Sequence, residues 1–445
     1  MAKMIKTGFL LILNLILAVL LGLALLYIVF LLPTEKMDQN VRKAAFTISE
    51  EGVYPKLSSS FTSTLDNFTD SIMLLEAADD RDVPTLTRAV SAYRGGMNYS
   101  DNPADVLVGH YVWDYDFETT LTYLRYWHGY LVFLKPLLML TDYHGIRVVN
   151  GIVHALLVLF CAYLFIKRKK DLYAIPWMLG YFMLMPLVLA KSLQYSSCFY
   201  VFVIGSLALL LIKDTWKFAP FIFLNIGIAT AFFDYLTYPI ATFGVPMAVC
   251  LVLMENAENK LVSYIWSVIK NGIFWCIGYA GMWVSKWVVT SIIKHYDVVS
   301  EALGVFQYRT SDTEAGVQFS RGSVVAGNFY YFLRTPVIYI TLICLVYLIY
   351  TLIKNKASHS AYAWKKFIPY LIVSLAPVVW YCFALNHSGV HVFFANKACI
   401  VSYVSLLFGL ISVSETRDVA VEMIQTSEQE VTTDGQNSST DSVLE

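Results

Sequence analysis

Two aspartates four residues apart, Asp66 and Asp70, are the residues of this chain best suited to chemistry. They lie in the run Asp66-Asn67-Phe68-Thr69-Asp70, and on a helix residues four apart share one face. A pair of carboxylates could include a general base, or it could hold a divalent cation such as Mg²⁺ or Mn²⁺. A helix cap beside one solvated carboxylate would explain the same spacing, so the pattern alone leaves these alternatives open.

Further ionisable side chains collect near the ends of long apolar segments. The candidates for binding substrate are Arg125, His128, Asp234, Lys286, Arg309, His387, His391 and Lys397. An ionisable residue within a membrane span costs about 2.5–3.5 kcal/mol on insertion scales and usually marks a site or a partner. We therefore expect these residues to contact a substrate, with the cations among them near a phosphate group.

Several of these residues also have a plainer explanation. Lys286 could extend its ammonium to the lipid head groups, and Asp234 could mark a turn. His387 and His391 have the spacing of a metal pair on a helix, but Gly389 interrupts that helix and no Cys or third His lies nearby in the sequence. Hydrogen bonding to a phosphate or a sugar is favoured over metal binding for this pair, with a plain polar turn as the alternative. Whether a metal is bound stays open.

The elements that must position these residues are hydrocarbon-length apolar segments. The chain has 445 residues, of which 57% are hydrophobic and only 15% are charged, whereas about a quarter are charged in soluble domains. This composition indicates a polytopic membrane protein. The net charge of −1 argues against a nucleic-acid partner. All seven cysteines lie in or beside apolar segments, which is typical of small buried hydrophobes and not of a disulfide framework.

A bilayer core requires about 20 apolar residues per helix, and by this measure the chain has about ten transmembrane helices. We therefore predict an all-α polytopic membrane protein. The predicted spans are 8–32, 146–166, 172–190, 196–212, 218–234, 238–254, 272–293, 334–353, 367–385 and 396–413.

Lysine and arginine in the short flanks of these spans, including Lys167 to Lys170, fall on one side if ten spans alternate. That side is predicted to be cytoplasmic, and both termini lie there. The loops 33–145 and 294–333 then face outside, within one transmembrane domain that covers 1–413. Residues 414–445 are polar and acidic, and we predict a disordered cytoplasmic tail.

The large first loop is predicted to contain interfacial helices. Thr69 or Asp70 would cap a helix that continues from Ser71. The apolar segment 129–140 is too short to span a bilayer and is broken by Lys135-Pro136, so an interfacial or re-entrant helix is expected there.

This layout resembles the GT-C class of membrane glycosyltransferases, including its lipid-phosphosugar-dependent mannosyltransferase and arabinosyltransferase-like branches. The run from Asp66 to Asp70 stands where that family has an acidic motif near the start of its first outer loop. The segment 127–137 looks like a diverged His-Pro-Pro-Leu segment, and 145–150 resembles the start of the second membrane helix. There is no adjacent Asp-Glu pair and no His-Pro-Pro, so the match to the family's catalytic acid stays open between Asp66 and Asp70.

The resemblance implies an inverting glycosyltransferase. The donor would be a polyprenyl-phosphate sugar with its tail between helices, and the acceptor a glycan, a lipid or a protein on the outer side. One aspartate would take the proton of the acceptor hydroxyl, and Lys286, Arg309, His391 or Lys397 would neutralise the departing phosphate. Membrane lipids are the other expected partners. The sequence requires no cofactor, and whether a divalent cation (Mg²⁺ or Mn²⁺) takes part stays open. The lack of paired loop cysteines favours a bacterial plasma membrane.

Two other classes of function are considered. A transporter or flippase of lipid-linked sugars would share the hydrophobicity, but it should carry polar groups along a path through both leaflets. A non-catalytic assembly protein of the cell envelope could use the acidic tail for docking. The ionisable residues collect at the outer rim, which favours the enzyme.

Overall fold

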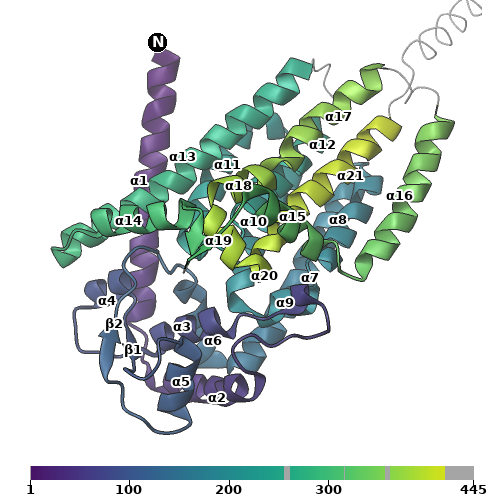
Figure 1. Ribbon diagram of the computed structural model, residues 1–445. Helices are drawn as coiled ribbons and strands as arrows, with labels where there is room; N and C mark the ends of the chain where they lie inside the picture. The colour runs from purple at the N-terminus through teal and green to yellow at the C-terminus, as the bar shows by residue number, and fades with distance from the viewer. Residues whose placement is uncertain (1, 255–260, 315, 356–360, 416–445) are drawn as a thin grey trace, which may run out of the picture.

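The computed structural model describes residues 2–254, 261–314, 316–355 and 361–415. Apart from two short antiparallel strand pairs, its regular elements are helices, as predicted. Figure 1 shows a helical bundle and, beneath it, a smaller layer formed by the first loop. The predicted tail at 414–445 lies, except for its first two residues, outside the described residues.

The bundle is formed by helices from the whole length of the described chain. Its helices are α1 (Ala2–Phe30), α7 (Tyr143–Lys167), α8 (Asp171–Met183), α9 (Pro186–Lys191), α10 (Leu193–Leu211), α11 (Thr215–Phe233), α12 (Ile240–Met254), α13 (Leu261–Lys294), α16 (Val337–Lys354), α17 (Ala361–Ser374), α18 (Ala376–Phe383), α19 (Leu385–Val390), α20 (Val392–Ala395) and α21 (Ile400–Ser414). The second loop, between α13 and α16, contains α14 (Val298–Thr310), β3 (Thr313–Glu314), β4 (Val317–Gln318) and α15 (Arg321–Phe332).

The layer beneath the bundle is built from the first loop. Its elements are α2 (Glu35–Glu51), the 3₁₀ turn Phe61–Ser63, α3 (Asn67–Ala78), α4 (Thr85–Ser91), β1 (Arg94–Gly96), α5 (Pro103–Tyr111), β2 (Thr119–Leu121) and α6 (Leu131–Leu140). A buried apolar cluster joins this layer to the long helices, because its members include Leu26 of α1, Leu224 of α11 and Met282 of α13. The layer is therefore fixed against the ends of the bundle (Figure 1).

Among the described helices, eight are long and apolar enough to cross a membrane, not the ten predicted. The predicted span 172–190 is broken, because α8 ends at Met183 and α9 begins at Pro186, with Met185 between them at a φ of 58°. Proline has no N–H to continue the hydrogen bonding of α8. The predicted span 238–254 corresponds to α12, of which 15 residues are described, fewer than the 18 or so that spanning requires.

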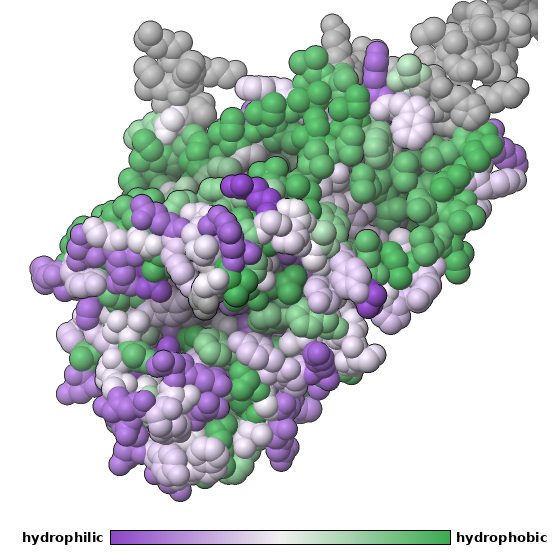
Figure 2. Space-filling model, viewed as in Figure 1, coloured by the Kyte–Doolittle hydropathy of each residue, from purple (hydrophilic) through white to green (hydrophobic). Residues whose placement is uncertain are grey.

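The sides of the bundle are apolar. Figure 2 shows mainly hydrophobic residues over the helices of the bundle and mostly polar residues over the first-loop layer. In the most apolar part of α16 only 6% of the residues are buried, and Ile343 is 71% exposed. Apolar surface of this extent is suited to contact with lipid and not with water. The chain is therefore plausible as a multi-pass membrane protein.

Two glycines set the distance between α11 and α13. A Cβ added to Gly227 would lie 2.2 Å from the carbonyl oxygen of Trp275, and one added to Gly278 would lie 2.1 Å from that of Leu224. Small residues of this kind let the backbones of membrane helices approach closely.

We expect Gly278→Ala to push α11 and α13 apart and to lower the stability of the protein by about 1–3 kcal/mol, the usual cost of overpacking. Thermal unfolding of the purified protein in detergent would measure the loss. Gly272→Ala in the same helix is the control, because a Cβ there would lie 3.4 Å from the nearest atom of Phe243, an ordinary contact. Equal melting temperatures of the two variants would contradict this account of the crossing.

Candidate functional site

Asp66 caps α3 and is buried. Its carboxylate accepts a hydrogen bond from the backbone N–H of Thr69 at 3.1 Å and another from the Thr69 hydroxyl at 2.9 Å. The helix therefore begins at Asn67, and the expectation that Thr69 or Asp70 would be its cap is wrong. Burial raises the pKa of Asp66 to about 7, although the hydrogen bonds from Thr69 lower it. Among the described residues, no cation forms an ion pair with this carboxylate.

Asp70 caps a different helix, α10. Its two oxygens accept hydrogen bonds from the backbone N–H groups of Leu193 at 3.0 Å and Gln194 at 3.2 Å. The hydroxyl of Tyr143 donates a further hydrogen bond at 2.5 Å. A carboxylate is well placed at a helix N-terminus, where N–H groups lack partners and the helix dipole is positive. Burial nevertheless raises the pKa of Asp70, to about 6. Asp70 thus attaches the first-loop layer to the bundle.

Arg147 lies at the centre of a polar network behind Asp70. Its guanidinium donates to both carboxylate oxygens of Glu51, at 2.6 and 2.9 Å, and to the side-chain oxygen of Asn67 at 3.2 Å. It also donates to the Tyr143 hydroxyl at 2.9 Å and to the carbonyl of Lys191 at 2.8 Å. A two-pronged arginine–carboxylate pair restrains both partners. One side chain therefore holds α2, α3, α7 and the end of α9 together.

Glu51 has a central place that the sequence analysis missed. Burial favours its neutral acid, but hydrogen bonds and the charge of Arg147 hold the pKa of Glu51 below its usual value. The two residues are 96 positions apart, and Glu51 follows another glutamate at the end of a polar helix. No local spacing therefore signals the pair.

Lys397 lies beside the segment that leads into Asp66. Its ammonium is 4.4 Å from the ring centre of Tyr195, and the Tyr195 hydroxyl donates to the carbonyl of Thr64 at 3.2 Å. The N–H of Asp66 donates to the hydroxyl of Ser192 at 3.1 Å, at the start of the same helix as Tyr195. Lys397 is 2% exposed, and its ammonium makes no hydrogen bond or ion pair with any other described residue. A buried ammonium without a counter-charge is suited to a site that binds an anion.

His387 and His391 face each other at 4.8 Å between ring centres. The Nε2 of His387 donates to the carbonyl of Leu236 at 2.6 Å, so α19 lies against the turn after α11. Arg309, from α14, donates to Nε2 of His391 at 3.3 Å. Burial, followed by the charges of His391 and Arg309, lowers the pKa of His387 well below its usual value. His387 is therefore a neutral residue that holds α19 in place.

Phe394 connects these histidines with Lys397. Its ring stacks on His391 at 5.0 Å and lies 6.2 Å from the ring of Tyr195, which in turn carries the Lys397 ammonium on its face. A series of contacts therefore runs from Arg309 through His391, Phe394 and Tyr195 to Lys397, and the Tyr195 hydroxyl bonds to the segment that leads into Asp66. We call Asp66, Tyr195, Lys397, His391 and Arg309 the Asp66 cluster.

Lys286 and Arg125 are not part of this cluster. The ammonium of Lys286 donates to the carbonyl of Val90 at 2.6 Å and lies 5.6 Å from the ring centre of Trp127. Arg125 forms an ion pair with Glu301 of α14. Each of these cations therefore attaches the first loop to α13 or α14 through a partner within the protein.

Asp234 also has its partners within the protein. It accepts hydrogen bonds from the N–H of Thr237, at 2.9 Å, and from the Thr237 hydroxyl. This is the geometry of a turn that ends α11, and it matches the plainer explanation of the residue. Burial raises the pKa of Asp234 to about 6.

His128 belongs to a second buried polar group, in the first-loop layer. Its Nδ1 lies 3.1 Å from a carboxylate oxygen of Glu76 and 2.9 Å from the hydroxyl of Tyr130, and its Nε2 donates to the carbonyl of Tyr123 at 2.7 Å. The hydroxyl of Tyr235 lies 3.1 Å from the same Nδ1. Glu76 is fully buried, and the sequence analysis missed it. Its only signal was a carboxylate in an otherwise apolar stretch of α3.

No three His, Cys, Asp or Glu side chains of the described residues lie close enough together to hold a metal ion. We also compared the chain with protein-family models, curated proteins and solved structures, and none of them matches it.

We expect Glu51→Gln to destabilise the protein by about 3 kcal/mol, because it leaves the buried guanidinium of Arg147 without its counter-charge. Limited proteolysis of the first loop and thermal unfolding at pH 7 would show the effect. Because the pKa of Glu51 is lowered in the folded state, the wild-type protein should also lose stability as the pH falls below about 4.5.

The control for this prediction is Glu50→Gln, which changes the adjacent, exposed glutamate. It should leave both the proteolysis pattern and the melting temperature unchanged. If Glu51→Gln melts at the same temperature as Glu50→Gln, Arg147 does not hold the two layers together.

Proposed function

We propose that this chain is an integral-membrane glycosyltransferase of the GT-C type, which transfers a sugar from a polyprenyl-phosphate donor to an acceptor outside the cytoplasm. Two buried charges without a counter-charge carry the proposal. The buried carboxylate of Asp66 has no cation for a partner, and the buried ammonium of Lys397 has no anion among the described residues; Tyr195 lies between their two segments. Such a pair supports a reaction that needs both a base and an anion site.

The proposed reaction uses the two charges in one displacement. Asp66 takes the proton from an acceptor hydroxyl, and the acceptor oxygen forms a bond to the anomeric carbon of the donor. The bond from that carbon to the phosphate oxygen breaks, its electron pair stays on the phosphate, and the anomeric configuration inverts. Lys397 neutralises the charge on the departing phosphate in a site with little water. A pKa of about 7 makes Asp66 a base suited to neutral pH.

Asp66 is the better base of the two aspartates. Both oxygens of Asp70 accept hydrogen bonds from α10, and the hydroxyl of Tyr143 adds another. Asp70 therefore acts as a positioning residue, because it fixes the start of α10 to which the N–H of Asp66 is bound.

The other predicted site residues divide into two groups. Arg309 and His391 extend the cationic side of the Asp66 cluster and are assigned to the donor phosphate. The remaining five bond to partners within the protein and are assigned to holding the loops in place: Arg125, His128, Asp234, Lys286 and His387.

The proposed membrane orientation rests on the distribution of lysine and arginine. The basic flanks, such as Lys167 to Lys170, lie at the cytoplasmic side, so the loop 33–145 and the Asp66 cluster lie outside. A bacterial plasma membrane with both termini in the cytoplasm is the location that we propose.

We expect Asp66→Asn to lower sugar transfer by about 10²–10⁴-fold, the usual contribution of a general base. Asparagine caps helices as well as aspartate does, so the fold should persist, and thermal unfolding would verify this. Transfer of radiolabelled sugar from a polyprenyl-phosphate donor in proteoliposomes is the measurement. Asp101→Asn, in an exposed position of the same loop, should retain full activity.

Full activity of Asp66→Asn would exclude Asp66 as the base. If the wild-type protein moves the lipid-linked sugar across the bilayer without transferring it, the chain is a flippase and not a transferase.

We further expect kcat/KM to fall with a slope of one as the pH drops below about 7, because Asp66 must be ionised to accept a proton and burial has raised its pKa to about 7. A pH profile of transfer between pH 5 and 9 would test this. A profile that stays flat down to pH 5 would show that no group with the raised pKa of Asp66 acts as the base.

A further inference from the structure

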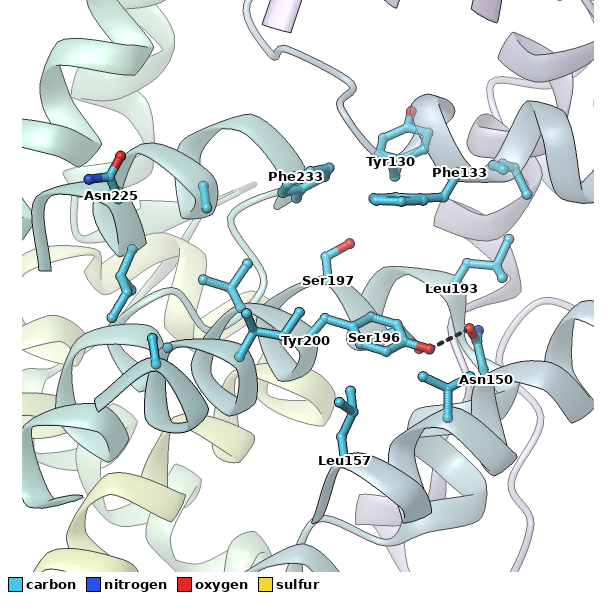
Figure 3. A pocket seen from close by; sticks show the side chains of 18 of the residues that line it. Tyr130, Phe133, Asn150, Leu157, Leu193, Ser196, Ser197, Tyr200, Asn225 and Phe233 are labelled. Atoms are coloured by element: carbon cyan, nitrogen blue, oxygen red, sulfur yellow. Dashed lines mark hydrogen bonds between the residues drawn. The ribbon is translucent and has the colours of Figure 1, made fainter. Parts of the chain in front are cut away.

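A long apolar groove runs along the bundle between α7, α10 and α11 (Figure 3). Its volume is about 880 Å³, and along α10 its lining extends from Leu193 to Ile212. Twenty residues of helix are about 30 Å long, which is the thickness of the hydrocarbon core of a bilayer. Met73 of α3 and Phe133 of α6 line the outer end. The groove is therefore about as long as the hydrocarbon core of a bilayer is thick.

The groove is separate from the Asp66 cluster. Ser197 lines the groove, whereas Tyr195 contacts Lys397. Two residues of an α-helix are roughly 200° apart around its axis, so these side chains leave α10 on opposite faces. A molecule in the groove therefore does not occupy the Asp66 cluster.

The wall of the groove is not purely apolar. The Tyr200 hydroxyl donates to Oδ1 of Asn150 at 3.0 Å, which leaves the amide Nδ2 of Asn150 as a free donor (Figure 3). The Ser197 side chain also lines the groove. Neither Nδ2 of Asn150 nor the Ser197 hydroxyl is hydrogen-bonded to another described residue. Asn150 is seven residues from the outer end of α7 at Tyr143, or about 10 Å along the helix.

We propose that this groove binds one ester-linked membrane glycerolipid. One acyl chain lies along α10, and the ester carbonyls of the lipid accept hydrogen bonds from Nδ2 of Asn150 and from the Ser197 hydroxyl. Glycerolipids carry ester carbonyls just below their head groups, close to the depth of these two residues. A polyprenyl chain has no acceptor there, because its polar atoms are confined to the phosphate end. A free amide in hydrocarbon is costly, and the carbonyl removes that cost.

The proposal can be tested without any assay of sugar transfer. The full-length protein is placed in nanodiscs that contain phosphatidylglycerol, its ether-linked analogue and undecaprenyl phosphate in equal amounts, and the lipids that it retains are counted by native mass spectrometry. We expect one ester-linked lipid to be retained about 2- to 10-fold more often than the ether-linked one, the preference that one hydrogen bond provides. Asn150→Leu and Ser197→Ala should each weaken this preference.

Two tryptophan variants provide matched controls. Ala208→Trp fills the inner part of the groove and should abolish retention of all three lipids. Leu156→Trp, at a lipid-facing position of α7 outside the groove, should change nothing. Equal retention of the ester-linked and ether-linked lipids by the wild-type protein, or stronger retention of undecaprenyl phosphate, would overturn the proposal. This comparison decides the matter even if a variant does not fold.

Discussion

The guanidinium of Arg147 is the contact on which the arrangement of the first-loop layer depends. From the first turns of α7 it binds the last residue of α2, Glu51, the first residue of α3, Asn67, and the last residue of α9, Lys191. A buried arginine must have its charge and its N–H groups satisfied, so these segments cannot separate without exposing it or leaving it unpaired. Asp66, one residue before α3, is placed by the same contact. The position of the proposed base is thus set by an ion pair that takes no part in the reaction.

Satisfied and unsatisfied charges distinguish the scaffold from the Asp66 cluster. Arg147 and Lys286 are as deeply buried as many core residues, yet each has a partner at hydrogen-bond distance. Asp66 is held only by Thr69, and its raised pKa means that its contribution to stability is present below about pH 4 and is lost as the pH rises towards 7. Proteins retain such unfavourable groups mainly where they have a function. This contrast, and not the burial of charge by itself, singles out Asp66 and Lys397.

Hydrophobic pattern predicted the fold better than it predicted the site. Each predicted span contains helix, because a long apolar run has few other ways to satisfy its backbone in lipid. The division at Met185 depends on a left-handed residue before a proline, which composition does not reveal. The importance of Glu51 and Glu76 could not be predicted either, since their partners lie 96 and 52–54 positions away. Residue type showed which side chains could do chemistry, but only tertiary contacts showed which of them already have a partner.

Helix α10 joins these features, and its sequence explains how. Its first two turns, Leu193 to Tyr200, mix hydroxyl, amide and aromatic side chains, whereas the rest of the helix is almost wholly apolar. The polar turns are shared between two faces: Tyr195 faces Lys397 and the carbonyl of Thr64, while Ser197 and Tyr200 face the groove. Asp70 binds the end of the helix between these faces. A helix held at its end by a loop carboxylate can therefore present one face to the loops and the other to the groove without a change in its backbone. This explains why its polar residues are concentrated in its first turns.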